Sequence, residues 1–151
     1  MAQNIYNISD YIEIVCRIKS LQPENERQWG IMTLPQMLQH CSIQLKMALR
    51  ILPEGAIEST FLYRTALGRW LSLYVIPWPK GFGTPTAMDM SKNNVVAKSF
   101  EEEKQELLDM LLLTKLTINL APHHFYGSIS HKDWGRLIWV HLNHHLKQFD
   151  A

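Results

Sequence analysis

The sequence is poor in cysteine: it has only Cys16 and Cys41, which are far apart and form no CxxC pair. A domain held together by disulfides normally has more cysteines at ordered spacings, so these two favour a reducing compartment. Residues 1–10 are polar and mixed, and they lack the basic and then apolar regions of a secretory signal. We therefore expect a cytoplasmic protein.

Charge is sparse as well. Only 19% of the residues are charged, the net charge is +1, and no run of five or six like charges occurs. Proteins that bind nucleic acid usually carry a strongly basic surface, so we expect no nucleic acid partner. The most apolar stretch, residues 107–120, is interrupted by polar side chains and is too short to cross a bilayer. We expect no membrane partner either.

What the sequence does have is an ordinary globular composition, with 46% hydrophobic residues in a chain of 151. This length supports one domain with a proper core and is too short for two comfortable ones. It predicts a single domain over residues 1–151.

Apolar residues recur at helical spacing in five stretches, and no stretch reads convincingly as a strand. Thr33-Leu-Pro-Gln36 has the form of a capping box with a proline in the first turn, and Ser99 with Glu102 forms a second capping box. Prolines end several of the stretches. The expected helices cover residues 9–21, 33–52, 57–76, 99–120 and 130 to near the C-terminus.

Four long helices and a shorter one, joined by mostly short loops, predict an all-α fold. The specific expectation is an antiparallel four-helix bundle with an additional short helix. The loop 77–98 is the long exception. Loops of that length in a compact domain are usually functional or mobile, so we expect this one to help cover a substrate pocket.

The last expected helix contains the most informative pattern. At about 100° per residue, His141 and His145 fall about 20° to either side of Trp134, on a stripe that is otherwise apolar and should face the core. His144 lies about 80° off, at the edge of that stripe. Two imidazoles one turn apart on a buried face can converge on one metal ion.

A third ligand has to come from elsewhere, and the second expected helix offers His40. Its inward stripe would hold His40 with Met37, Gln44 and Met47. If the second and last helices pack together, the three histidines form one face. Three protein ligands leave a coordination position for water or substrate, as in catalytic sites.

Other interpretations of these side chains stay open. A single histidine on an apolar face is more often a hydrogen-bonded core residue than a ligand. His123 and His124 lie in a turn, where they either donate to a ligand of the metal or have no role. Gln44 and Gln148 either hydrogen-bond an imidazole or a bound molecule, or fill the core with a local partner.

The remaining candidates are weaker. Cys41 points about 100° away from His40 on a helix, and a buried structural thiol is its expected role. Trp139 should face away from the bundle, which would mark a subunit contact or the packing of the first helix. Asp109 and Glu58 are the only carboxylates worth testing near the metal, and both are expected to be solvated.

Several segments in combination resemble the DinB-like superfamily, in particular a branch of uncharacterised bacterial proteins. The resemblance runs from about residue 25 to the C-terminus. After His145 the chain departs from better-known members: Leu146-Lys147-Gln148 stands where they tend to have Arg-Gly-Gln. The segments that carry the resemblance are Trp29-Gly30-Ile-Met32, Met37-Leu-Gln-His40, Pro77-Trp-Pro-Lys-Gly81, His123-His-Phe-Tyr-Gly127, Trp134-Gly135 and His141-Leu-Asn-His144-His145-Leu-Lys-Gln148-Phe149.

The resemblance implies a four-helix bundle that binds a divalent metal, often nickel or zinc, through three histidines. Carried over residue by residue, these are His40, His141 and His145. The superfamily includes metal-dependent thiol transferases and an isomerase that uses a low-molecular-weight thiol, so such a thiol is a further expected cofactor. Homodimers are common among such bundles.

The sequence therefore predicts a metal-dependent enzyme with transferase or hydrolase chemistry on an unidentified small-molecule substrate. The alternative from another class is a non-catalytic helical bundle that binds a small ligand or a protein partner. In that case the histidines hold a vestigial or structural metal.

Overall fold

The structure is a computed structural model that describes residues 2–53, 59–81 and 96–151. Its described part is all-helical, as expected, and holds no strand, only an isolated β-bridge between His123 and Gly127. The elements are α1 (Ile8–Ser20), α2 (Leu34–Ala48), α3 (Phe61–Arg64), α4 (Ala66–Trp70), the π-helix η1 (Leu71–Val75), α5 (Phe100–Leu116) and α6 (His131–Gln148).

Both expected capping boxes are present and explain where α2 and α5 begin. The Thr33 hydroxyl accepts from the backbone N–H of Gln36, whose side chain accepts from the backbone N–H of Thr33. Ser99 and Glu102 make the same reciprocal pair at the start of α5. These bonds satisfy N–H groups that have no partner within the helix.

The third expected helix, residues 57–76, is wrong as one continuous element. Thr65 has an extended backbone, with φ −71° and ψ 153°, and it ends α3 and caps α4. Its hydroxyl donates to the carbonyl of Leu62 and accepts from the N–H of Gly68. A threonine hydroxyl that bonds the backbone locally competes with the helical pattern, which explains the break. Residues 57 and 58 lie outside the described part.

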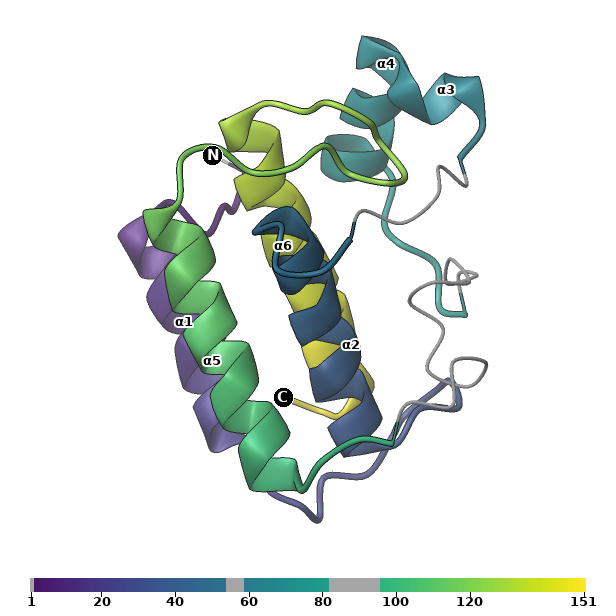
Figure 1. Ribbon diagram of the computed structural model, residues 1–151. Helices are drawn as coiled ribbons and strands as arrows, with labels where there is room; N and C mark the ends of the chain where they lie inside the picture. The colour runs from purple at the N-terminus through teal and green to yellow at the C-terminus, as the bar shows by residue number, and fades with distance from the viewer. Residues whose placement is uncertain (1, 54–58, 82–95) are drawn as a thin grey trace.

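Neighbouring helices do not all run in opposite directions, so the expectation of an antiparallel bundle is only partly right. Gln39 of α2 contacts Glu103 of α5, and Lys46, further along α2, contacts Glu106, further along α5. Because the residue numbers increase in the same direction on both helices, α2 and α5 are parallel. Figure 1 shows the same arrangement. A short loop cannot join parallel neighbours, and here the connection spans residues 49–99.

The first and last helices are the other parallel pair. The N–H of Ile5 donates to the carbonyl of Gly135 at one end, and Arg17 donates to Asn143 further along. In Figure 1, α5 is antiparallel to α1, and α2 is antiparallel to α6. The four long helices thus contact one another in a closed ring, in the order α1, α5, α2, α6.

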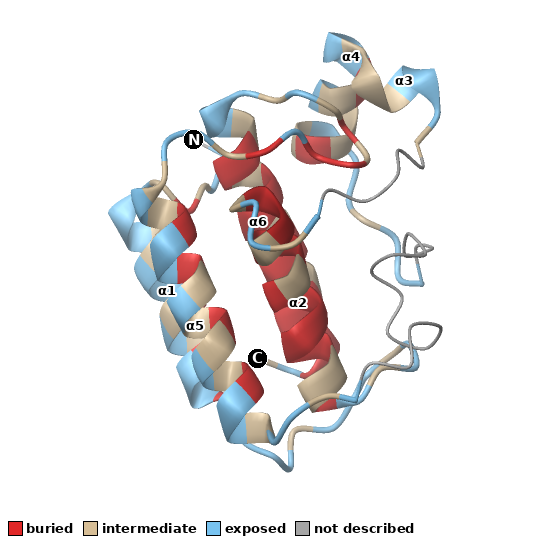
Figure 2. Cartoon of the chain, in the orientation of Figure 1, coloured by how far each residue is buried: buried red, intermediate tan, exposed pale blue. Residues whose placement is uncertain are grey.

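Burial is concentrated on α2 and α6, as Figure 2 shows. Buried residues occur all round α2 because α5 covers one side and α6 the other, whereas α1 and α5 keep exposed outer faces. Among the described residues, no helix has the length and apolar character needed to cross a membrane. The largest fully buried apolar side chains include Ile14, Ile18, Met37, Leu38, Leu45, Leu107, Leu111, Leu137 and Phe149.

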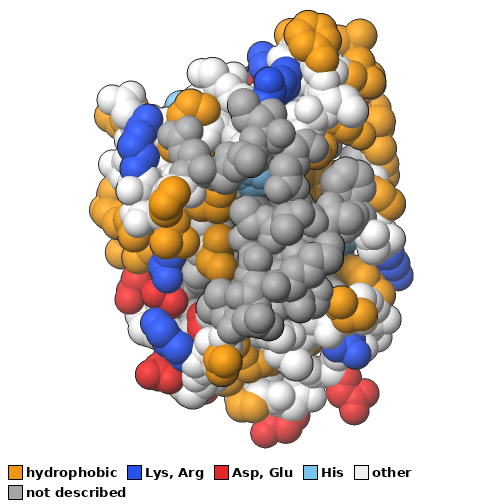
Figure 3. Space-filling view, turned by 45° about the vertical axis from the view of Figure 1, so that its right-hand side comes forward, with side chains coloured by type: hydrophobic (Ala, Val, Ile, Leu, Met, Phe, Trp, Pro, Cys, Tyr) orange, Lys and Arg blue, Asp and Glu red, His pale blue; other side chains and the backbone are white. Residues whose placement is uncertain are grey.

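The short helices carry most of their hydrophobic side chains at the surface. Figure 3 shows hydrophobic side chains gathered along the upper right-hand edge of the molecule. The exposed hydrophobic residues in and next to α3, α4 and η1 are Phe61, Leu62, Leu67, Trp70, Val75 and Ile76.

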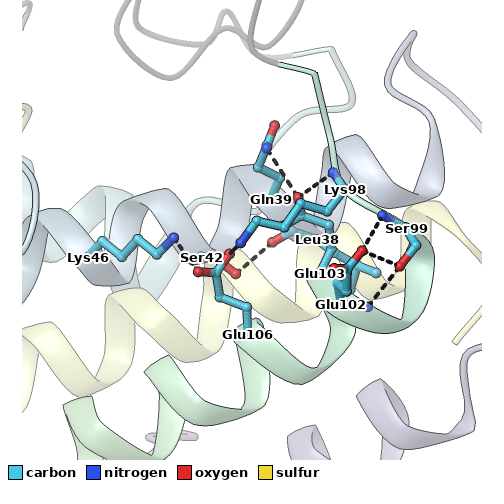
Figure 4. Close-up of polar contacts among 9 residues, drawn as sticks. All are labelled: Leu38, Gln39, Ser42, Lys46, Lys98, Ser99, Glu102, Glu103 and Glu106. Carbon is cyan, nitrogen blue, oxygen red and sulfur yellow. Dashed lines mark hydrogen bonds and ion pairs between the residues drawn. The ribbon is translucent and has the colours of Figure 1, made fainter.

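A buried polar contact joins α2 to α5, as seen in Figure 4. Glu103 is fully buried, and its Oε1 accepts from Nε2 of Gln39 and from the backbone N–H of Lys98. Its Oε2 has no hydrogen-bond partner among the described residues. Beside it, Glu106 forms ion pairs with Lys46 at 2.6 Å and with Lys98 at 3.6 Å.

Candidate metal centre

Three histidines from two helices meet inside the fold: His40 on α2, and His141 and His145 on α6. All three are buried, and one nitrogen of each lies within 4.8 Å of the others. Nε2 of His40 is 2.9 Å from Nε2 of His141. Nitrogens at that separation can both bind one ion at about 2.0–2.1 Å. The three side chains that helical spacing selects are therefore a group that could hold a metal ion.

The two helices present the rings in a compact cluster. His141 and His145 are one turn apart on α6, which leaves their ring centroids 4.7 Å apart and the rings nearly perpendicular, at 86°. The His40 ring comes from α2, with its centroid 4.9 Å from His141 and 4.8 Å from His145. The i, i+4 spacing of His141 and His145 thus brings their rings together on one face of α6, as the sequence pattern predicts.

A glutamine fixes the orientation of His145. Nε2 of Gln148 donates to the carbonyl of Trp29 at 2.7 Å, so its Oε1 is left as the acceptor for Nδ1–H of His145 at 2.9 Å. This assigns the proton to Nδ1 and leaves the Nε2 lone pair of His145 available. Gly30, with φ +83°, makes room for the glutamine: a Cβ there would lie 2.5 Å from Nε2 of Gln148.

The environment keeps the imidazoles of His141 and His145 neutral. Burial lowers the pKa of His141 well below its ordinary value, and nearby His145 and His40 lower it further. Burial and then His40 lower the pKa of His145 to about 3. Metal ligands must be deprotonated, and a neutral imidazole keeps one lone pair for that purpose. Nδ1 of His141 is buried and has no hydrogen-bond partner among the described residues.

A cavity of about 170 Å³ opens beside the histidines, and all three line it. None of the described lining residues is acidic, lysine or arginine. Such a site removes water from a bound molecule and offers few competing charges. The aromatic lining residues are Tyr63, Trp78, Phe125 and Tyr126.

The turn before α6 holds His123 at the same cavity. Nδ1 of His123 accepts from the backbone N–H of Phe125 at 3.0 Å, and its Nε2 lies 3.4 Å from Nε2 of Gln44. His124 stacks on His123, with ring centroids 4.2 Å apart. Gln44 therefore lies beside a histidine, and His123 and His124 line the cavity without belonging to the three-histidine group.

Sequence reasoning missed the aromatic wall of the cavity. The Trp78 ring centroid lies 6.0 Å from that of His141 and 6.2 Å from that of His144. Trp78 belongs to the loop 77–98, which the sequence predicts to help cover a pocket; residues 82–95 of that loop lie outside the described part. His144 is half-buried and flanks the cluster, as its helical angle predicts.

The weaker candidates have the following places. Cys41 is buried, as expected, and burial strongly raises the pKa of its thiol. Trp139 is buried too, which argues against the subunit contact and leaves packing within the chain as its role; the Arg136 guanidinium lies 5.5 Å from its ring centroid. Asp109 is exposed and bonds to Gln105, and Glu58 lies outside the described residues.

Residues 3–151 match the profile of a family described as "Protein of unknown function (DUF1569)". The chain belongs to the DUF1569 family. No curated protein and no solved structure matches it. The chemistry of this DUF1569 chain has to be argued from the residues themselves.

The donor set of the DUF1569 chain fits a divalent metal of the transition series. Three buried imidazoles suit zinc, nickel, copper and iron, and they do not suit magnesium or calcium, which prefer oxygen ligands. The nearest described polar groups of the cavity are further imidazoles and amides, with no carboxylate among them.

Proposed function

We propose that this chain is a metal-dependent enzyme of the DinB-like type, with nickel or zinc held by His40, His141 and His145. The observation that carries the proposal is the meeting of three buried histidine ring nitrogens at the wall of a cavity. A bound metal would supply a water or thiol of lowered pKa, and hence a nucleophile near neutral pH.

The helix arrangement also supports an enzyme of the DinB-like type. Four long helices close a ring, and two of them supply one and two histidines respectively. That division matches what the DinB-like resemblance implies for a four-helix bundle. The additional short helices, α3 and α4, belong to the long connection between α2 and α5.

The surrounding residues have roles that do not depend on the substrate. Gln148 holds the His145 ring and its tautomer, which is how outer partners usually support a metal ligand. Trp78, Tyr63 and Phe125 would hold an apolar molecule and keep bulk water away from it. His124 and Gln44 are the polar side chains placed to orient it.

We propose thiol-dependent transfer or hydrolysis as the reaction class, with a low-molecular-weight thiol as co-substrate in the first case. The absence of carboxylates among the described cavity residues supports a nucleophile generated without an acidic general base. A screen of thiols with electrophilic substrates tests this class, and flat progress curves with every thiol would reject transfer.

Metal binding itself is tested by equilibrium dialysis and metal analysis of protein made without an affinity tag. We expect one ion per chain, lost in His40→Ala, His141→Ala and His145→Ala. His131→Ala is the matched control, because His131 is exposed on the same helix as two of the ligands. A folded wild-type protein that binds no metal would favour a non-catalytic binding module instead.

We propose a cytoplasmic location and a homodimer. The two cysteines are free, and one of them is exposed, which suits a reducing compartment. Exposed hydrophobic side chains on α3 and α4 support a second copy of the chain as the partner. Sedimentation velocity tests the dimer, and a monomer at all accessible concentrations would reject it.

A further inference from the structure

A second cavity, of about 340 Å³, lies behind the wall of the first. The two cavities share Ile76, Pro77, Trp78 and His144, so they are neighbours with a common wall. The three-histidine cluster does not line the second cavity. Its chemistry is therefore independent of the candidate metal.

The charged residues that line this cavity are all positive: Lys80, Arg136 and Lys147. None of them forms an ion pair with a described carboxylate. Two acids lie close to this wall without lining the cavity: Asp133 accepts a hydrogen bond from Tyr74 at 2.8 Å, and Asp10 acts electrostatically on Arg136.

Two of these cations are held in place. Arg136 donates from Nε to the carbonyl of Leu73 at 2.8 Å and from Nη1 to Gln3, while its Nη2 makes no hydrogen bond to a described residue. Lys80 lies over the Trp29 ring, with Nζ 4.5 Å from the centroid. Cations already fixed by neutral groups lose little freedom when an anion binds.

The rest of the wall is largely aromatic. Trp29, Trp78, Trp139 and Tyr74 line the cavity with apolar residues of η1. Flat aromatic faces beside cations suit a molecule that has a flat apolar body and an anionic group. A fully hydrated inorganic anion would gain nothing from the aromatic walls.

From these observations we infer that the second cavity is a binding site for a small aromatic carboxylate. The carboxylate faces Lys80 and Lys147, at the end of the cavity that holds Trp29 and His144, and the ring lies against the tryptophans. The site sits next to the three-histidine cavity and works whether or not metal is bound.

The test is isothermal titration calorimetry of metal-free protein with 1-naphthoate and with its neutral analogue 1-naphthamide. We expect naphthoate to bind at least about tenfold more tightly, with an advantage that shrinks as salt is added. Lys147→Gln and Lys80→Gln should each weaken naphthoate by about threefold and leave naphthamide unchanged. Both lysines are exposed, so these variants should fold.

Lys132→Gln is the matched control, because it removes the same charge from an exposed position on α6 outside the cavity. It should leave naphthoate binding unchanged. Equal binding of the two probes, no binding of either, or an equal loss in Lys132→Gln would overturn the inference. So would naphthoate binding that is lost in His141→Ala and unaffected by Lys147→Gln, since that result places the probe in the histidine cavity. These measurements use metal-free protein, so their interpretation does not change if the histidine cluster fails to bind metal.

Discussion

The side chain of Gln148 decides which nitrogen of His145 faces the other two histidines. It connects a helix to a loop, because it donates to the carbonyl of Trp29 and accepts from Nδ1–H of His145. The sequence alone allows two roles for Gln148, either filling the core or forming a hydrogen bond to an imidazole. Its role depends on Trp29, which is far away in the sequence, and no helical spacing reveals that contact.

Replacing Gln148 should therefore weaken metal binding without removing a ligand. We expect Gln148→Met to raise the dissociation constant for zinc by about 10–100-fold, because the ring loses the acceptor that fixes its tautomer. Gln148→Glu keeps an acceptor and should retain more of the affinity. Competition with a chromophoric chelator measures both, and Gln105→Met on the surface of α5 is the control. Unchanged affinity in Gln148→Met would show that the contact is incidental.

The stability of the metal-free protein should depend on pH through the same histidines. The pKa of His145 falls from 6.5 to about 3 on folding, so between these values the unfolded chain binds more protons. The contribution of His145 to the free energy of unfolding is complete above about pH 6.5 and is lost as the pH falls towards 3. At pH 5 the free energy of unfolding is lower by roughly 2 kcal/mol for this reason. His141 acts in the same direction.

Urea unfolding at pH 7.5 and pH 5 measures this effect. We expect a lower free energy of unfolding at pH 5, and a smaller difference between the two pH values in His145→Gln. His131→Gln, at an exposed position, should keep the wild-type difference. A free energy of unfolding that is equal or higher at pH 5 would contradict the assignment of buried neutral imidazoles.

At the scale of elements, α2 is the most deeply placed helix, because it lies between α5 and α6 and is buried all round. The sequence predicted where it begins, since Thr33 and Gln36 form a local capping box. It did not predict that α2 and α5 are parallel. Direction depends on the path of residues 49–99, and local patterns carry no information about that path.

The buried contact between Gln39 and Glu103 gives a test of how α2 and α5 are held together. Glu103→Gln keeps an acceptor for Gln39 and for the N–H of Lys98, so its effect on stability should be small. Glu103→Ala leaves both donors buried and unpaired and should lower the free energy of unfolding by about 2–4 kcal/mol. Thermal or urea unfolding measures this.

Glu101→Ala is the control for that pair, because Glu101 is exposed in the same first turn of α5. It should cost well under 1 kcal/mol, about what a charge near a helix N-terminus contributes. Equal losses in Glu101→Ala and Glu103→Ala would mean that the buried contact adds nothing to the helix pair.

For the whole molecule, the three-histidine cluster joins parts of the chain that are a hundred residues apart in sequence, as the 101-residue separation of His40 and His141 shows. The helical period was enough to predict which histidines face inward on each helix. Only packing could place the two helices together, and only packing could bring together the aromatic cavity wall, whose residues come from the α2–α5 and α5–α6 connections. The single domain and the homodimer stay predictions.

A metal that bridges α2 and α6 should stabilise the folded chain. At about 100 times its dissociation constant the ion adds about 2.7 kcal/mol to the free energy of unfolding. For a chain of this size, that corresponds to a rise in Tm of roughly 5–10 °C. Differential scanning calorimetry with zinc or nickel, and then with chelator, measures the shift. His141→Ala should show no shift, and His131→Ala should show the full one.

The central claim is that one metal ion sits where these rings converge. The most direct measurement is an anomalous difference map from crystals of untagged, metal-loaded protein. The account predicts a single strong peak about 2.0–2.1 Å from one nitrogen of each of His40, His141 and His145. A metal peak elsewhere in the chain, or the three rings turned apart with no peak between them, would contradict it.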